Sequence, residues 1–248
     1  MTTTHPSQQP ARPSRGRAAC LWQRLLRRKP PLAKRRYIPH QLGVEGFFRA
    51  LRDRNIRYAV LRWFETLPDV APGEDIDMLI DDADLAAVAD LFDATTGVPC
   101  DVYSVTGRPG TSHHGEPYLP PAAARALLDQ AILLDGLFRV PSRHDHWLSL
   151  AFHAVYHKGL KSGLATTNPA LQPTASPEHD YAAVLGRLAD ELGLAVPIAL
   201  EPLQQHLVER GWAPSGAMLA MLAGRNAWLA AHMKMRRDAG GAGLLRSA

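Results

Sequence analysis

Two aspartates stand one residue apart in the apolar segment DIDMLI, where Asp75 and Asp77 flank Ile76. Side chains alternate between the two faces of a β-sheet, so both carboxylates are expected on one face, with Ile76 and Met78 packed on the other. Two ionised carboxylates that lie close together repel each other, and burial strengthens the repulsion. A divalent cation such as Mg²⁺ removes this conflict, because it prefers hard oxygen ligands and offsets their charge. The pattern therefore predicts a metal site.

A third carboxylate, Asp101, lies in the next apolar segment, CDVYSV. The connection between the two segments is long enough for a crossover between parallel strands, which would bring Asp101 beside Asp75 and Asp77. The alternative is that Asp75 and Asp77 face solvent on a half-exposed antiparallel edge strand.

The elements around these carboxylates follow from hydrophobic periodicity and from turn residues. We expect a helix over 40–55, strands over 56–63, 75–81 and 98–105, and a helix over 82–97 capped by Asp82. A short helix over 122–129, a strand within 132–141 and a helix over 142–159, capped by Ser142 and Asp145, follow. Residues 177–235 are expected to be entirely helical, with breaks near Pro197 and Pro214.

This arrangement resembles the nucleotidyltransferase fold of the polymerase-β-like superfamily over roughly residues 40–140. The resemblance implies an α+β fold, in which helices flank a mixed sheet and a helical C-terminal region follows. It also implies that Asp75, Asp77 and Asp101 hold one or two Mg²⁺ (or Mn²⁺) ions, with Asp101 as the third ligand or as the base that takes the acceptor's proton. The ions would bridge the phosphates of a nucleoside triphosphate or another phosphorylated donor.

The sequence departs from this family before the first aspartate. Family members carry a Gly-Ser or Gly-Gly pair there, whereas this chain reads VLRWFETLPDVAPGE, with Arg62 and Trp63 near the expected place. The guanidinium of Arg62 could bind phosphate instead. Equally, the chain could have lost triphosphate binding or could transfer a different phosphorylated group.

The segment HAVYHKG supplies the remaining candidate phosphate ligands, His157 and Lys158. The alternative is a hydrogen-bonded helix histidine and a solvated lysine. His153 and His157 have a zinc-like spacing, but Ala154 stands where a metalloprotease helix needs Glu, so zinc is not expected. Lys161 could add positive charge. We expect His144, His179 and the region of Trp228 to be structural.

The long loop over 106–120 is either a lid or acceptor-binding element beside the site or an ordinary connection. Its candidate residues for binding are Arg108, His113, His114 and Tyr118.

Charge and composition divide the chain into four parts: a disordered basic tail over 1–38, an α/β domain over 39–141, a helical region over 142–237 and a flexible tail over 238–248. Ten basic residues precede Glu45 with no acidic one, which leaves 18 basic against 24 acidic residues, a net charge of −6, for the remainder. Such an acidic body does not favour nucleic acid as a partner. A short amphipathic patch at Leu21–Leu26 could touch an anionic membrane surface or simply be solvated. The two cysteines and the lack of a secretory signal favour the cytoplasm.

The expected function is Mg²⁺-dependent transfer of a nucleotidyl or related phosphoryl group to a small-molecule, sugar or protein acceptor. The wording VLRWFETLP…GEDIDMLI and HAVYHKG resembles nucleotidyltransferase-like proteins of bacterial surface-polysaccharide pathways. One alternative is a catalytically silent binding module on the same fold. Another is a phosphotransferase that acts on a glycan or lipid.

Overall fold

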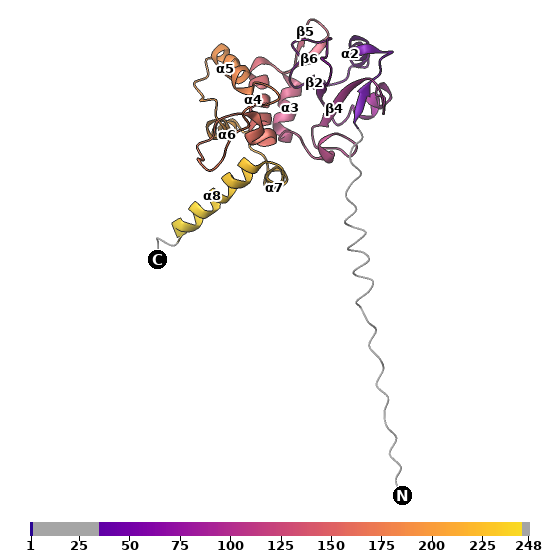
Figure 1. Cartoon of the computed structure of the whole chain (residues 1–248). Coiled ribbons are helices and arrows are strands. Elements are labelled where there is room, and N and C mark those ends of the chain that lie inside the picture. Colours follow the sequence, from indigo (N-terminus) through magenta and orange to yellow (C-terminus); the bar gives the residue numbers. More distant parts are fainter. Residues whose placement is uncertain (2–34, 245–248) are drawn as a thin grey trace. The chain divides into compact units, whose positions relative to one another are not determined.

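A four-stranded mixed sheet forms the centre of the N-terminal half (Figure 1). The computed structural model describes Met1 and residues 35–244, without the side chains of residues 114 and 237–244. The strands lie in the order β1 (Arg36–Ile38), β4 (Val98–Ser104), β3 (Ile76–Ile80) and β2 (Tyr58–Val60). Together with the helices described below, this sheet confirms the α+β class.

The strand that carries Asp77 lies inside the sheet. β3 pairs in parallel with β4, which places Asp77 opposite Asp101, and it pairs antiparallel with β2. All five residues of β3 are buried. The predicted parallel pair is therefore confirmed, and the alternative of a solvent-facing edge strand is wrong.

The first strand lies within the tail that we expected to be disordered. Arg36–Ile38 pairs antiparallel with β4, and Tyr37 also exchanges two backbone hydrogen bonds with Asp93. Ile38 is fully buried, so apolar burial fixes this segment to the sheet. The ordered body thus begins earlier than predicted. Residues 2–34 of the tail, including the amphipathic patch at Leu21–Leu26, lie outside the described residues.

The connection from β3 to β4 contains a shorter helix than predicted. It contains the 3₁₀-helix η1 (Ala86–Leu91) instead of an α-helix over 82–97. Asp82 does not cap it, because its carboxylate accepts hydrogen bonds from the backbone and hydroxyl of Thr106. The carboxylate of Asp84 accepts from the backbone of Arg57. These carboxylates tie the start of the crossover to neighbouring segments instead of to a helix.

The remaining elements place helices on both faces of the sheet. α2 (Gly43–Asp53) confirms the first predicted helix. Residues 132–141 form a hairpin rather than one strand, because Asp135 and Gly136 adopt positive φ between β5 and β6. The other elements are η2 (His113–Gly115), α3 (Pro121–Asp129), β5 (Ile132–Leu134), β6 (Phe138–Val140), α4 (Arg143–Phe152), the π-helix η3 (His153–Lys158), η4 (Gly159–Ser162), α5 (Tyr181–Leu192), α6 (Leu200–Glu209), α7 (Gly216–Ala223) and α8 (Ala227–Leu244).

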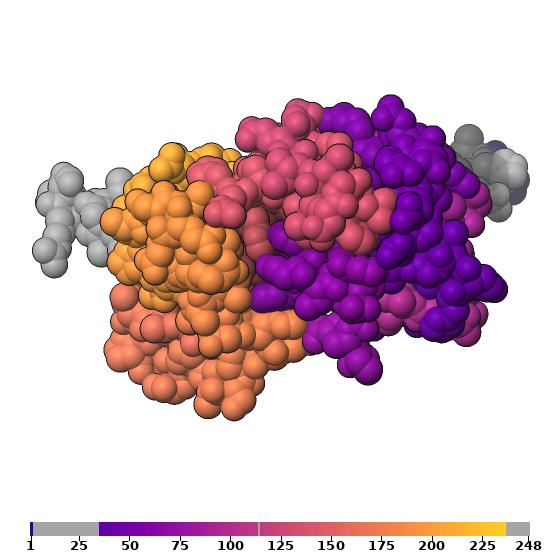
Figure 2. Space-filling view, turned by 90° about the horizontal axis from the view of Figure 1, so that it is seen from above, coloured from indigo at the N-terminus to yellow at the C-terminus, as the bar shows by residue number. Residues whose placement is uncertain are grey.

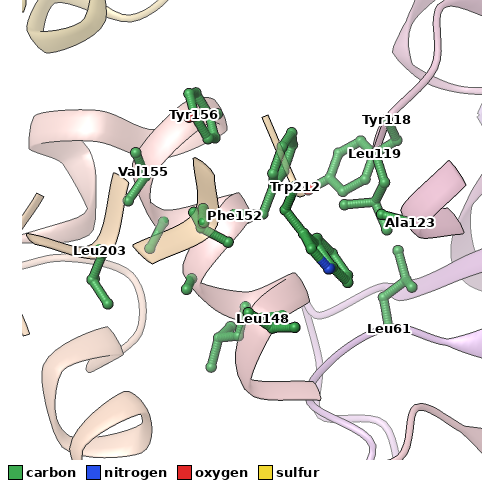
Figure 3. Close-up of a cluster of buried hydrophobic side chains, with 14 of the residues drawn as sticks. Leu61, Tyr118, Leu119, Ala123, Leu148, Phe152, Val155, Tyr156, Leu203 and Trp212 are labelled. Carbon is green, nitrogen blue, oxygen red and sulfur yellow. The ribbon is translucent and has the colours of Figure 1, made fainter. Parts of the chain in front are cut away.

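Two apolar clusters hold these layers together. One lies between α2 and the sheet and contains Phe47 and Phe48 of α2 together with Ile76, Met78 and Ile80 of β3. The other joins the opposite face of the sheet to α3 and the C-terminal helices, and Figure 3 shows part of it, with Leu61 near Ala123 and with Phe152 near Trp212. In the space-filling view the segment around α3, β5 and β6 lies between the N-terminal strands and the C-terminal helices (Figure 2). No helix among the described residues is both long enough and apolar enough to span a membrane.

Candidate functional site

A cleft of about 480 Å³ lies between the sheet and the helical half. One wall comes from β3, β4 and the β2–β3 loop, and the other comes from η3, η4 and the start of α5. Residues that line it include Arg35, Arg62, Trp63, Asp75, Asp77, Asp101, Tyr103, Tyr118, His153, His157, Lys158, Lys161, Glu178, His179 and Tyr181. The predicted metal ligands Asp75, Asp77 and Asp101 and the predicted phosphate ligands Arg62, His157 and Lys158 therefore all line this one cleft.

The three aspartates approach one another at the acidic wall. The register of β3 and β4 places Asp77 opposite Asp101, and Asp75 directly precedes β3. The Tyr103 hydroxyl donates to Oδ1 of Asp77 at 2.8 Å and lies 3.5 Å from Oδ2 of Asp101. Ile76 and Met78 pack in the cluster beneath α2, on the opposite face. The expected sharing of one face is thus confirmed.

Arg62 is the charge partner of Asp77. Its Nη2 lies 2.6 Å from Oδ1 of Asp77, and the two side chains are only 7% and 6% exposed. The guanidinium also lies over the ring of Tyr118, 5.3 Å from its centre. Arg62 therefore supplies a buried positive charge to the acidic wall.

Burial and mutual repulsion disfavour ionisation of these carboxyl groups. Burial raises the pKa of Asp77 to about 6, although Arg62 lowers it, and the charges of Asp75 and Asp101 raise it further. Burial, followed by the charge of Asp75, raises the pKa of Asp101. Asp75 is more exposed and forms an ion pair with Arg35. Arg35 and Arg62 supply the positive charge that favours ionisation of Asp75 and Asp77.

The opposite wall carries the lysines. Lys158 ends η3, and its Nζ lies 3.0 Å from Oε2 of Glu178. Lys161 lines the same wall from η4. His157 instead donates a hydrogen bond from Nε2 to the backbone carbonyl oxygen of Tyr118 (2.9 Å), and its ring stacks on that tyrosine. Burial, with the charge of His113 next, holds the pKa of His157 well below its usual range.

His153 is held between two phenols. Its Nδ1 contacts the hydroxyl of Tyr118, and its Nε2 lies 3.1 Å from the hydroxyl of Tyr181. Burial, with Arg62 next, holds the pKa of His153 well below its usual range, so the ring is neutral. His153 and His157 therefore brace Tyr118, which lies beside Arg62.

The π-helix that presents Lys158 has an identifiable cause. The buried side chain of Asn226, just before α8, donates through Nδ2 to the carbonyls of Val155 (2.8 Å) and Tyr156 (3.1 Å). Its Oδ1 accepts from the backbone of Leu229, and Gly159 packs against it with φ of 54°. Such π-helical turns often occur at functional sites. Nothing in the sequence near Asn226 signals this role.

Residues without an expected role in the site also line the cleft. His179 was expected to be structural; it does stack on Trp63, with ring centres 4.2 Å apart, and it also lines the cleft. Tyr103 was missed, although its position two residues after Asp101 signals the same face of β4. In the loop over 106–120, Tyr118 reaches the cleft, whereas Arg108 lies near Asp82 (3.8 Å) and does not line it. The lid role of this loop stays a prediction.

The acidic wall carries carboxylate oxygens, the ligand type that Mg²⁺ prefers. Three carboxylates line one cleft, and burial, followed by repulsion from neighbouring carboxylates, raises the pKa of Asp77 and Asp101. In the arrangement described, Arg35 and Arg62 engage Asp75 and Asp77. Within the part of the chain that the structure describes, no group of three or more His, Cys, Asp or Glu side chains has a metal-binding arrangement as it stands.

Comparisons with protein-family models, with curated proteins and with solved structures found no match for this chain. The relationship to nucleotidyltransferases therefore rests on the sequence pattern and stays a prediction.

Proposed function

We propose that the cleft catalyses Mg²⁺-dependent transfer of a nucleotidyl or related phosphoryl group to the hydroxyl of a small-molecule or glycan acceptor. The observation that carries this proposal is the placement of Asp75, Asp77 and Asp101 on one wall of a cleft whose other wall carries Lys158 and Lys161. A phosphorylated donor is anionic, so it needs positive charge on both sides: a cation at the carboxylates and the lysines opposite.

Asp75, Asp77 and Asp101 would hold the Mg²⁺ ion, which when bound neutralises phosphate charge and makes the acceptor hydroxyl more acidic. The carboxylate of Asp101, which lies opposite Asp77 on the neighbouring strand, takes the proton of that hydroxyl. The acceptor oxygen forms a bond to phosphorus while the bond from phosphorus to the leaving oxygen breaks. The electron pair of the broken bond stays with the leaving phosphate.

The basic residues have separate roles in this proposal. Lys158 and Lys161 bind phosphate oxygens, and Lys158 exchanges its ion pair with Glu178 for the donor. Arg62 is buried against Asp77, so it holds that carboxylate ionised and in place rather than following the substrate. Arg35 is 46% exposed and can leave Asp75 without opening the core.

The test is a thermal-shift screen of nucleoside triphosphates and nucleotide-sugars, with and without Mg²⁺ or Mn²⁺. A ligand present at about 100 times its Kd stabilises the folded state by roughly 2.7 kcal/mol, which raises Tm by about 5–10 °C for a chain of this size. We expect this rise for the wild type only with metal, and we expect Asp101→Asn to abolish it. Asp129→Asn, an exposed aspartate outside the cleft, is the matched control and should respond like the wild type.

A silent binding module is the second candidate, and one observation favours it: arginines occupy both Asp75 and Asp77, and the Gly-Ser turn is missing. Stabilisation by a nucleotide that is independent of metal and of Asp101 would support this alternative. A flat response across the whole panel would overturn the transferase proposal.

A further inference from the structure

A second cavity, of about 260 Å³, opens beside the cleft and is called the side cavity below. It shares five lining residues with the cleft: Arg62, Trp63, Glu74, Asp75 and His179. Its remaining walls come from β2, β3 and the β2–β3 loop. A molecule that occupied both spaces would pass Asp75, one of these five residues.

The walls of the side cavity are apolar, with one aromatic ring. The apolar residues are Val60, Leu67, Val70, Ala71 and Ile76. The indole of Trp63 lines the cavity and is held by stacking on His179 and by an edge contact with Tyr181, 5.7 Å between ring centres. The one neutral hydroxyl side chain on the lining, Thr66, already donates to the carbonyl of Asp69. The cavity therefore offers little to a sugar ring, which needs many hydrogen-bond partners.

The charge of the side cavity is negative. Four carboxylates line it: Glu65, Asp69, Glu74 and Asp75. The charge of Arg62 is directed at Asp77, so it does not offset them. Asp75 pairs with Arg35, and Glu74 lies 3.7 Å from Nε2 of His179, whereas within the described part of the chain Glu65 and Asp69 have no ion-pair partner. Phosphate is therefore repelled from the side cavity and stays in the cleft, where the lysines lie.

An apolar pocket with an indole and uncompensated carboxylates suits an organic cation. Ammonium groups bind over indole faces by cation–π attraction, and negative charge nearby adds to it. We propose that the side cavity binds the ammonium end of a small amino alcohol, whose hydroxyl end then lies toward Asp75. The identity of this molecule as the acceptor rests on the proposed function, whereas the binding of the ammonium group does not.

Isothermal titration of the full chain tests the binding without metal or nucleotide. The probes are choline and its neutral isostere 3,3-dimethyl-1-butanol, which has the same shape but no charge. We expect choline to bind at least about tenfold more tightly, because cation–π and charge attraction together contribute on the order of 1.4 kcal/mol or more. Added salt should weaken the binding of choline and leave the binding of the neutral alcohol unchanged.

The matched variants are Glu65→Gln with Asp69→Asn, and Trp63→Leu. The first pair lies on the surface and does not threaten folding, and it should reduce the choline preference to less than threefold. Glu116→Gln, outside the side cavity, is the control and should bind choline like the wild type. Equal affinity for the two probes, or choline affinity that both variants leave intact, overturns the inference. If choline binds as expected but the nucleotide screen stays flat, the cation site stands and only the transferase proposal fails.

Discussion

Replacement of Arg62 by methionine should destabilise the protein by an amount that grows with pH. The ion pair of Arg62 and Asp77 is buried, and the pKa of Asp77 is about 6 even with Arg62 in place, because burial raises it more than Arg62 lowers it. Without the guanidinium, Asp77 either stays ionised and unpaired or binds a proton. The cost of protonating Asp77 is therefore the upper limit on the part of the stability loss that depends on charge.

The limit follows from the pKa of Asp77. At pH 8 the carboxyl lies about two pH units above that pKa, so protonation costs roughly 3 kcal/mol, whereas at pH 6 it costs less than about 1 kcal/mol. Because folding raises the pKa of Asp77, this group stabilises the folded protein at low pH, and that stability is lost as the pH rises through the folded-state pKa. The variant has a still higher pKa, so its loss continues up to pH 8. The packing lost over Tyr118 is independent of pH.

Urea denaturation of Arg62→Met at pH 6 and pH 8, with chelator present, measures this difference. We expect the free energy of unfolding to fall by about 2–3 kcal/mol more at pH 8 than at pH 6. Arg54→Met is the control, because its ion pair with Asp90 is at the surface and its small effect should be equal at both pH values. An equal cost of Arg62→Met at both pH values would show that Asp77 is not held ionised by Arg62.

Three further predictions follow from single residues. Burial, and secondly the charge of Arg187, lowers the pKa of His146 to about 4 from its ordinary 6.5. The free energy of unfolding of the wild type should therefore fall by roughly 2 kcal/mol through this group between pH 7.5 and pH 5. In urea denaturation, His146→Leu should not show this decrease, whereas the exposed control His144→Leu should still show it. Gly159→Ala should lower the free energy of unfolding by about 2–3 kcal/mol, because φ is positive and the added Cβ would lie 2.1 Å from Oδ1 of Asn226. Gly136→Ala, where φ is positive but the space is open, should lower it by only about 1 kcal/mol in urea denaturation. Equal losses in the two variants would refute the proposed contact between Gly159 and Asn226. Lys158→Gln should weaken binding of the phosphorylated donor about fivefold in thermal-shift titrations, whereas the exposed Lys234→Gln should leave it unchanged.

Local pattern in the sequence determined much of the acidic wall. The alternation of DIDMLI placed Asp75 and Asp77 on one face, and the length of the connection predicted the parallel pairing that sets Asp101 opposite Asp77. The helix at Gly43–Asp53 and the helical C-terminal region follow from hydrophobic periodicity of the same kind. These features depend on residues close in sequence, so the residue pattern of each segment was enough to predict them.

Only the tertiary structure decided what surrounds those carboxylates. Three contacts join residues that lie apart in the chain. They are the ion pair of Arg62 with Asp77, the contacts of His153 with the hydroxyls of Tyr118 and Tyr181, and the hydrogen bonds of Asn226 to the π-helix. The strand at Arg36–Ile38 was missed for the same reason, because its partner is β4. A side chain's charge state and orientation depend on burial and on neighbours from other segments, and those neighbours are set by packing rather than by local spacing.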